Sequence, residues 1–128
     1  MGTPILLFEG GKSLELDPEV VECGVQGAYN VMKHLGMQQG EPDGDSNPIV
    51  IKKSKWIRAQ YSGIFETRVK NGTCVKKKSV IARISDPFGD FEKRILAPFD
   101  CYIFGLNTTS IVNKGDAIFH VSVETEND

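Results

Sequence analysis

Length, composition and charge exclude several classes of protein. The chain has 128 residues, 40% of them hydrophobic and 25% charged, which suits one core of ordinary globular size. A net charge of -2 gives no overall field that would attract nucleic acid or an anionic membrane. The three cysteines are far apart and form no CxxC pair, which argues against a disulfide framework or a cysteine zinc site. No segment resembles a signal peptide or a membrane span, so we expect a cytoplasmic protein with no nucleic-acid or membrane partner.

The first predicted element is a short strand at residues 4–8. Its sequence, PILLF, is a continuous apolar run typical of a strand that is buried on both faces. Only three residues precede it and the next element is helical, so no neighbouring strand is available beside it. Alone, this strand should be disordered, pair with a second copy of the chain to give a homo-oligomer, or join an edge of the sheet that follows.

A helix is predicted to begin at Pro18 and to end near Leu35. Asp17 is a suitable N-cap, proline is favoured at the first helical position, and Gly36 is a typical stop. Apolar residues at spacings of three and four form one broad stripe, which consists of Val20, Val21, Val25, Ala28, Val31, Met32 and Leu35. This stripe needs an apolar surface such as a sheet to cover it.

The chain changes character after a polar segment at residues 38–48. That segment is rich in glycine, proline and aspartate and has no periodicity, so we interpret it as a linker. Residues 49–124 are predicted to be nearly all β, with strand patterns at 49–51, 56–59, 63–69, 75, 79–84, 91–96, 102–106, 111–112 and 117–123. Residues 125–128 are polar and should form a disordered tail.

An internal repeat of about 37 residues is the most informative feature of the β region. Residues 56–84 and 94–121 align so that Ala59 matches Ala97, and the run VKK at 75–77 matches VNK at 112–114. Each copy would form a small β-hairpin unit that cannot bury its apolar face alone. The two copies should therefore pack together as a sandwich or barrel with pseudo-twofold symmetry.

This repeat is similar to the biotinyl/lipoyl type of barrel-sandwich hybrid. Carrier domains of that type place a modifiable lysine at the tip of the hairpin that joins the two halves. The corresponding tip here is residues 86–90, which contains no lysine, so we expect no prosthetic group on it. Asp86 and Asp90 are better explained by turn chemistry than by a paired-carboxylate site. The copies also differ from each other, because Lys78 stands where the second copy has Gly115.

Glu9 is the candidate catalytic residue. It ends the apolar strand and is followed by two glycines, which allow a sharp turn and a close approach by a ligand. Carboxylates at the C-terminal ends of strands in open α/β sheets face the ligand crevice, so Glu9 could be a general base. On position alone, the better explanation is that Glu9 is the first solvated residue after a strand, so position is not enough to assign a role.

The chain as a whole resembles the C-terminal part of the succinylglutamate desuccinylase and aspartoacylase family, which is related to the zinc carboxypeptidases. The resemblance rests on PILLFEGG at 4–11, LELD at 14–17, GVQGAYNVM at 24–32, HLGM at 34–37, WIRA at 56–59 and SDPFG at 85–89. It implies that residues 1–37 are the last strand and helix of a truncated α/β zinc-hydrolase domain. Residues 49–124 would then be a barrel-sandwich hybrid that shapes the mouth of the active site.

The resemblance also implies a reaction, which is hydrolysis of the amide bond of an N-acyl amino acid or a related compound. Glu9 would be the acid/base that takes a proton from zinc-bound water and passes it to the departing amine. The family supplies its zinc ligands from an HxxE pair and a later histidine, whereas this chain has only His34 and His120, neither in such a motif. We therefore expect zinc in the full-length parent, no metal in this chain, and no activity of this chain alone.

An alternative from another class is a non-catalytic, lipoyl-like β module that binds a partner or ligand, with Glu9 purely structural. The lysines at 52, 53 and 55 beside Trp56 are better explained as a solvated strand entrance than as a nucleic-acid patch. We expect Trp56 to close one end of the barrel.

Overall fold

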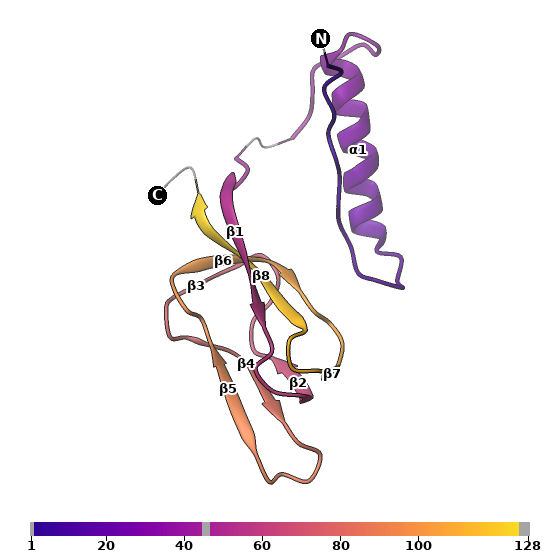
Figure 1. The fold of residues 1–128 in the computed structure, drawn as a ribbon. Coiled ribbons are helices and arrows are strands. Elements are labelled where there is room, and N and C mark those ends of the chain that lie inside the picture. Colours follow the sequence, from indigo (N-terminus) through magenta and orange to yellow (C-terminus); the bar gives the residue numbers. More distant parts are fainter. Residues whose placement is uncertain (1, 45–46, 126–128) are drawn as a thin grey trace. The chain divides into compact units, whose positions relative to one another are not determined.

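The fold is mainly β and is described by a computed structural model for residues 2–44 and 47–125 (Figure 1). The chain divides into two compact units, Met1–Asn47 and Pro48–Asp128. Most of the predicted tail, residues 126–128, lies outside the described residues. Within those residues, no helix combines the length and the apolar character that crossing a bilayer requires.

Among the described residues of the first unit there is one helix, α1 (Pro18–His34), as the sequence predicts. The side chain of Asp17 accepts a hydrogen bond from the Val20 amide at 3.4 Å, and Pro18 opens the first turn. At the other end, the Met37 amide donates to the Met32 carbonyl at 2.9 Å. Gly36, at φ +70°, completes this Schellman motif, so both ends of the helix are set by the residues expected there.

The segment predicted as a buried strand does not form one. Residues 4–8 take part in no β-ladder and run alongside α1 (Figure 1). Ile5, Leu6 and Leu7 are more than 80% exposed, whereas Phe8 packs on the helix, where a Cβ added at Gly24 would lie 2.9 Å from its ring. The prediction fails because the described residues provide no strand that pairs with this backbone, and α1 itself has no buried residue.

One residue of the polar segment at 38–48, Asp43, forms hydrogen bonds with α1. The Asp43 amide donates to the Asn30 side chain at 2.9 Å, and the Asp43 carboxylate accepts from Lys33 at 2.6 Å. The hydrogen bond from Lys33 holds the pKa of Asp43 below its usual value. This part of the segment therefore belongs to the first unit.

The described part of the second unit contains eight strands, which lie near the nine predicted patterns because the patterns at 49–51 and 56–59 belong to one strand, β1. They are β1 (Ile51–Arg58), β2 (Gly63–Thr67), β3 (Thr73–Val75), β4 (Val80–Ser85), β5 (Glu92–Leu96), β6 (Cys101–Leu106), β7 (Ile111–Val112) and β8 (Ala117–Thr125). The lysine-rich entrance is part of β1 itself and is exposed to solvent.

The strands form two four-stranded antiparallel sheets related by the internal repeat. The strand orders are β1-β8-β6-β3 and β5-β4-β2-β7, and every strand pairs antiparallel with its neighbours. Exchanging β1 to β4 with β5 to β8 converts one order into the other. Each sheet therefore takes two strands from each copy, which is the pseudo-twofold arrangement that the repeat predicts.

Reciprocal hydrogen bonds join the two copies. The Gly115 amide of the second copy donates to the Ala59 carbonyl of the first at 2.8 Å. The Lys78 amide of the first copy donates to the Ala97 carbonyl of the second, also at 2.8 Å. Aligned residues thus make the same hydrogen bond in both directions, and a turn of each copy is bonded to the backbone of the other copy.

The core lies between the two sheets. The largest fully buried side chains come from both copies and include Ile81, Ile84, Ile103, Ile118 and Phe119. The ring of Phe65 meets the ring of Phe119 edge to face, with centroids 6.0 Å apart. All members of this core belong to the second unit.

Candidate functional site

Glu9 lies exposed at the end of the extended segment. It makes no hydrogen bond or ion pair with another described residue, and Phe8 beside it packs on α1. The described residues bring no other candidate catalytic group to this carboxylate. The proposed role of Glu9 stays a prediction, because the groups it would work with are not among these residues.

The two histidines lie in separate units and have different surroundings. His34 is exposed in the last turn of α1, where a cation is favourable near the helix C-terminus. His120 is in β8. Across the described ranges, no group of three or more histidine, cysteine, aspartate or glutamate residues is placed to hold a metal ion. The residues present therefore do not fit the catalytic zinc that the family resemblance implies.

His120 belongs to an aromatic cluster on the β1-β8-β6 part of one sheet. Its ring stacks on Trp56, with ring centroids 4.0 Å apart and planes inclined by 13°. The centroid of the Phe104 ring lies 4.2 Å from that of His120. Its Nε2 lies 2.9 Å from the Ser54 hydroxyl, and burial lowers the pKa of His120. Trp56 is 48% exposed and alternates with Ile57, which packs against the core. The expectation that Trp56 closes one end of the barrel is therefore wrong.

The two cysteines of the second unit differ in exposure. Cys101 is buried in the core, and this burial, together with the charge of Asp100, raises the pKa of its thiol. Cys74 is exposed on β3. Cys101 is therefore a small residue of the core.

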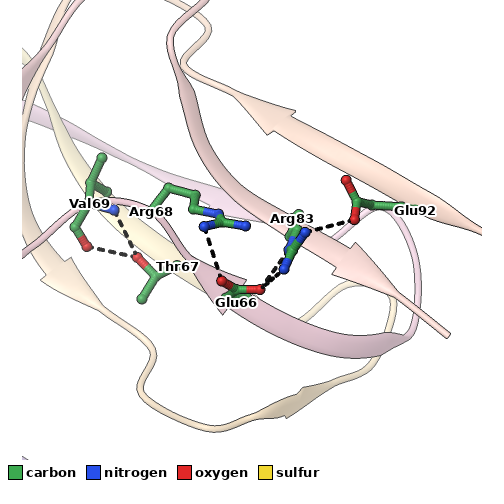
Figure 2. A network of polar contacts seen from close by, with 6 residues as sticks. All are labelled: Glu66, Thr67, Arg68, Val69, Arg83 and Glu92. Atoms are coloured by element: carbon green, nitrogen blue, oxygen red, sulfur yellow. Dashed lines mark hydrogen bonds and ion pairs between the residues drawn. The ribbon is translucent and has the colours of Figure 1, made fainter. Parts of the chain in front are cut away.

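A network of ion pairs covers the other sheet (Figure 2). Arg83 on β4 donates through Nε to Glu66 at 2.6 Å and through Nη1 to Glu92 at 2.9 Å. Arg68 Nη1 lies 3.2 Å from the second oxygen of Glu66. The hydrogen bond with Glu66 raises the pKa of Arg83, which stays charged. Arg83 is thus held in one place by two carboxylates.

Sequence reasoning did not find this network. Glu66, Arg83 and Glu92 come from three strands, and Arg68 follows the end of β2. Their proximity depends on the pairing register that places Glu66 opposite Arg83. A usable signal was present in the alternation of charged residues with buried ones, for example Arg83 between Ala82 and Ile84. That alternation indicates the face of a side chain but not its cross-strand neighbour.

Comparisons with known proteins give structural neighbours only. No protein-family model matches the chain, and no curated protein matches its sequence. A succinylglutamate desuccinylase/aspartoacylase from Rhodobacter sphaeroides matches with a TM-score of 0.76 at 22% identity, over 89% of this chain and 38% of its own. The ectoine utilization protein EutE (DoeB) from Ruegeria pomeroyi matches with a TM-score of 0.75 at 19% identity, over 86% of this chain and 35% of its own. A succinylglutamate desuccinylase from Silicibacter sp. TM1040 matches with a TM-score of 0.72 at 20% identity, over 86% of this chain and 35% of its own.

These matches establish the fold and show how much of the chain shares it. The second unit makes up less than two thirds of the chain, so matches over 86% to 89% must include part of the first unit. The chain spans little more than a third of each of these neighbours. The likeness is consistent with a C-terminal portion of such a protein.

Proposed function

We propose that this chain is the C-terminal part of a zinc-dependent deacylase of the succinylglutamate desuccinylase/aspartoacylase type, which acts in the cytoplasm on the amide bond of an N-acyl amino acid. One observation carries this proposal. Solved proteins with that description match both the β unit and part of the helical unit, although the sequences are at most 22% identical among those compared. The second unit would be a barrel-sandwich hybrid, an assignment supported by its pseudo-twofold sheets.

Glu9 is the residue of this chain to which we assign chemistry. A carboxylate at the end of a strand, followed by two glycines, can take a proton from a water molecule and return it to a departing amine. When bound, zinc would supply Lewis-acid activation of the reacting water or carbonyl. Since the described residues do not form a zinc site, its ligands and the rest of the active site would have to come from additional polypeptide. By itself, the chain should be inactive.

The extended segment at residues 4–8 supports this assignment. Its side chains are mostly exposed, and its backbone forms no hydrogen bonds to other described backbone groups. An apolar segment with unpaired backbone groups is a ready template for strand pairing. We propose that it pairs with a sheet of the parent domain, and that in isolation it lets two copies associate.

The test is hydrolysis by the full open reading frame that encodes this segment. Replacing Glu9 by Gln keeps the size of the side chain and removes its basicity, so turnover of N-succinyl and N-acetyl amino acids should fall by about 10² to 10⁴-fold. Glu22→Gln is the matched control, because Glu22 is an exposed glutamate on α1 with no described partner, and it should leave turnover unchanged. Equal activity of the two variants would refute the role of Glu9.

A second candidate function is partner or ligand binding by the β unit without catalysis. The observation that favours it is that this unit has a complete core of its own. Absence of hydrolysis and of bound zinc in the full open reading frame product, with binding retained by the β unit, would favour this candidate.

A further inference from the structure

The charged face of the β5-β4-β2-β7 sheet contains an arrangement that the ion-pair network does not explain. In the strand register, Arg83 lies directly opposite Glu66 on one side and directly opposite Arg94 on the other. Two like charges at directly opposed positions destabilise an antiparallel pair. The sheet therefore keeps together two arginines whose mutual repulsion needs compensation.

The available carboxylates compensate Arg83 but not Arg94. Glu66 and Glu92 together bind three nitrogens of Arg83, and Glu66 also contacts Arg68. Figure 2 shows both carboxylates turned toward Arg83. Arg94 is exposed, and its side chain has no ion pair or hydrogen bond with any residue that the structure describes. Three guanidinium groups thus face two carboxylates, and the uncompensated charge is on Arg94.

These groups surround a surface cavity of about 340 Å³. It is lined by Arg68, Val80, Arg83, Glu92 and Arg94. Val80, which is 39% exposed, is the apolar member of this lining. A volume of this order is large enough for a small organic molecule.

We propose that this cavity binds a small carboxylic acid with an apolar portion, whose carboxylate is held by Arg94. A guanidinium group binds a carboxylate through two parallel hydrogen bonds, and the donors of Arg94 are free to do so. The apolar portion of the ligand contacts Val80. Glu92 is in the lining and repels a multiply charged anion, which favours a monocarboxylate over phosphate. This site is independent of Glu9 and of the proposed hydrolysis.

The test is an NMR titration of the 128-residue protein with N-acetylleucine. Saturable shifts are expected at the amides of Val80, Arg83 and Arg94. N-acetylleucinamide, which has the same shape without the carboxylate, should give no saturable shift. Arg94→Gln should weaken binding by about tenfold or more, the effect of losing a charge-assisted hydrogen-bonded contact.

Matched variants separate a built site from general electrostatics. Lys93→Gln removes the same charge from the next residue of β5, whose side chain points to the other face of the sheet, and binding should be retained. Arg94→Lys keeps the charge but loses the paired donors and should also weaken binding. Equal effects of Lys93→Gln and Arg94→Gln, equal binding of the neutral amide, or tighter binding of inorganic phosphate would each overturn the proposal. Because no turnover is measured, these outcomes are independent of the deacylase assignment.

Discussion

Lys78 occupies a backbone conformation that suits glycine. Its φ is +68°, and its counterpart in the second copy, Gly115, has φ +99°. A side chain in the left-handed region costs about 1 to 2 kcal/mol relative to an unstrained conformation. We expect Lys78→Gly to raise the free energy of unfolding by about 0.5 kcal/mol, since part of the gain is offset by the greater chain entropy of unfolded glycine. Urea unfolding of the two proteins would measure the difference.

The neighbouring lysine provides the control for this prediction. Lys77 is exposed, lies in the same turn, and is not among the described residues with positive φ. Lys77→Gly should therefore lower the free energy of unfolding, because it adds entropy to the unfolded chain without relieving strain. Stabilisation by both glycines would show that removal of positive charge from this turn, and not backbone conformation, is responsible.

At the scale of elements, Asp86 holds the turn between β4 and β5. Its two carboxylate oxygens accept hydrogen bonds from the amides of Phe91 at 2.9 Å and Phe88 at 3.2 Å. The hydrogen bond from Phe91, with a smaller contribution from Phe88, lowers the pKa of Asp86 below 3.8. A carboxyl whose folded pKa is below its unfolded pKa stabilises the fold above the unfolded value, and this contribution is lost as the pH falls through the folded pKa.

We therefore expect the effect of Asp86→Asn to depend on pH. At pH 7 the variant should unfold at a lower urea concentration than the parent, and the gap should narrow as the pH falls below about 4. Asp90→Asn tests a carboxylate of the same turn that has no side-chain partner among the described residues, and it should show no such gap. A gap for Asp86→Asn that stays constant down to about pH 2.5 would contradict the assignment of its cause.

Patterns within one element were predictable from the sequence, whereas contacts between elements were not. The caps of α1 and the alternation of apolar and polar residues along each strand are local features. Asp17, Gly36 and the eight described strands therefore lie at or near their predicted positions. The strand predicted at residues 4–8 does not form, because an apolar run becomes a strand only beside a partner strand. The Glu66–Arg83 pair depends on register, which the strands acquire only when the two copies pack.

At the scale of the whole molecule, the candidate site is the least predictable feature. Glu9 was singled out by its place after an apolar run and by family resemblance, yet a catalytic carboxylate is defined by neighbouring groups. None of those neighbours is among the described residues, whereas the core of the β unit is complete. The chain thus combines a unit that is explained by its own contacts with one that is not.

This difference predicts that the two units have very different stabilities. A shortened chain of residues 48–128 should unfold cooperatively at the same urea concentration as the full chain, because every member of the described core lies within it. Residues 1–47 alone should show little helix, since α1 has 17 residues, none of them buried, and isolated helices of that length are marginal in water. Circular dichroism during urea unfolding of all three chains would check both expectations. Loss of cooperativity on removing residues 1–47 would show that the β unit draws stability from the first unit, and would refute their independence.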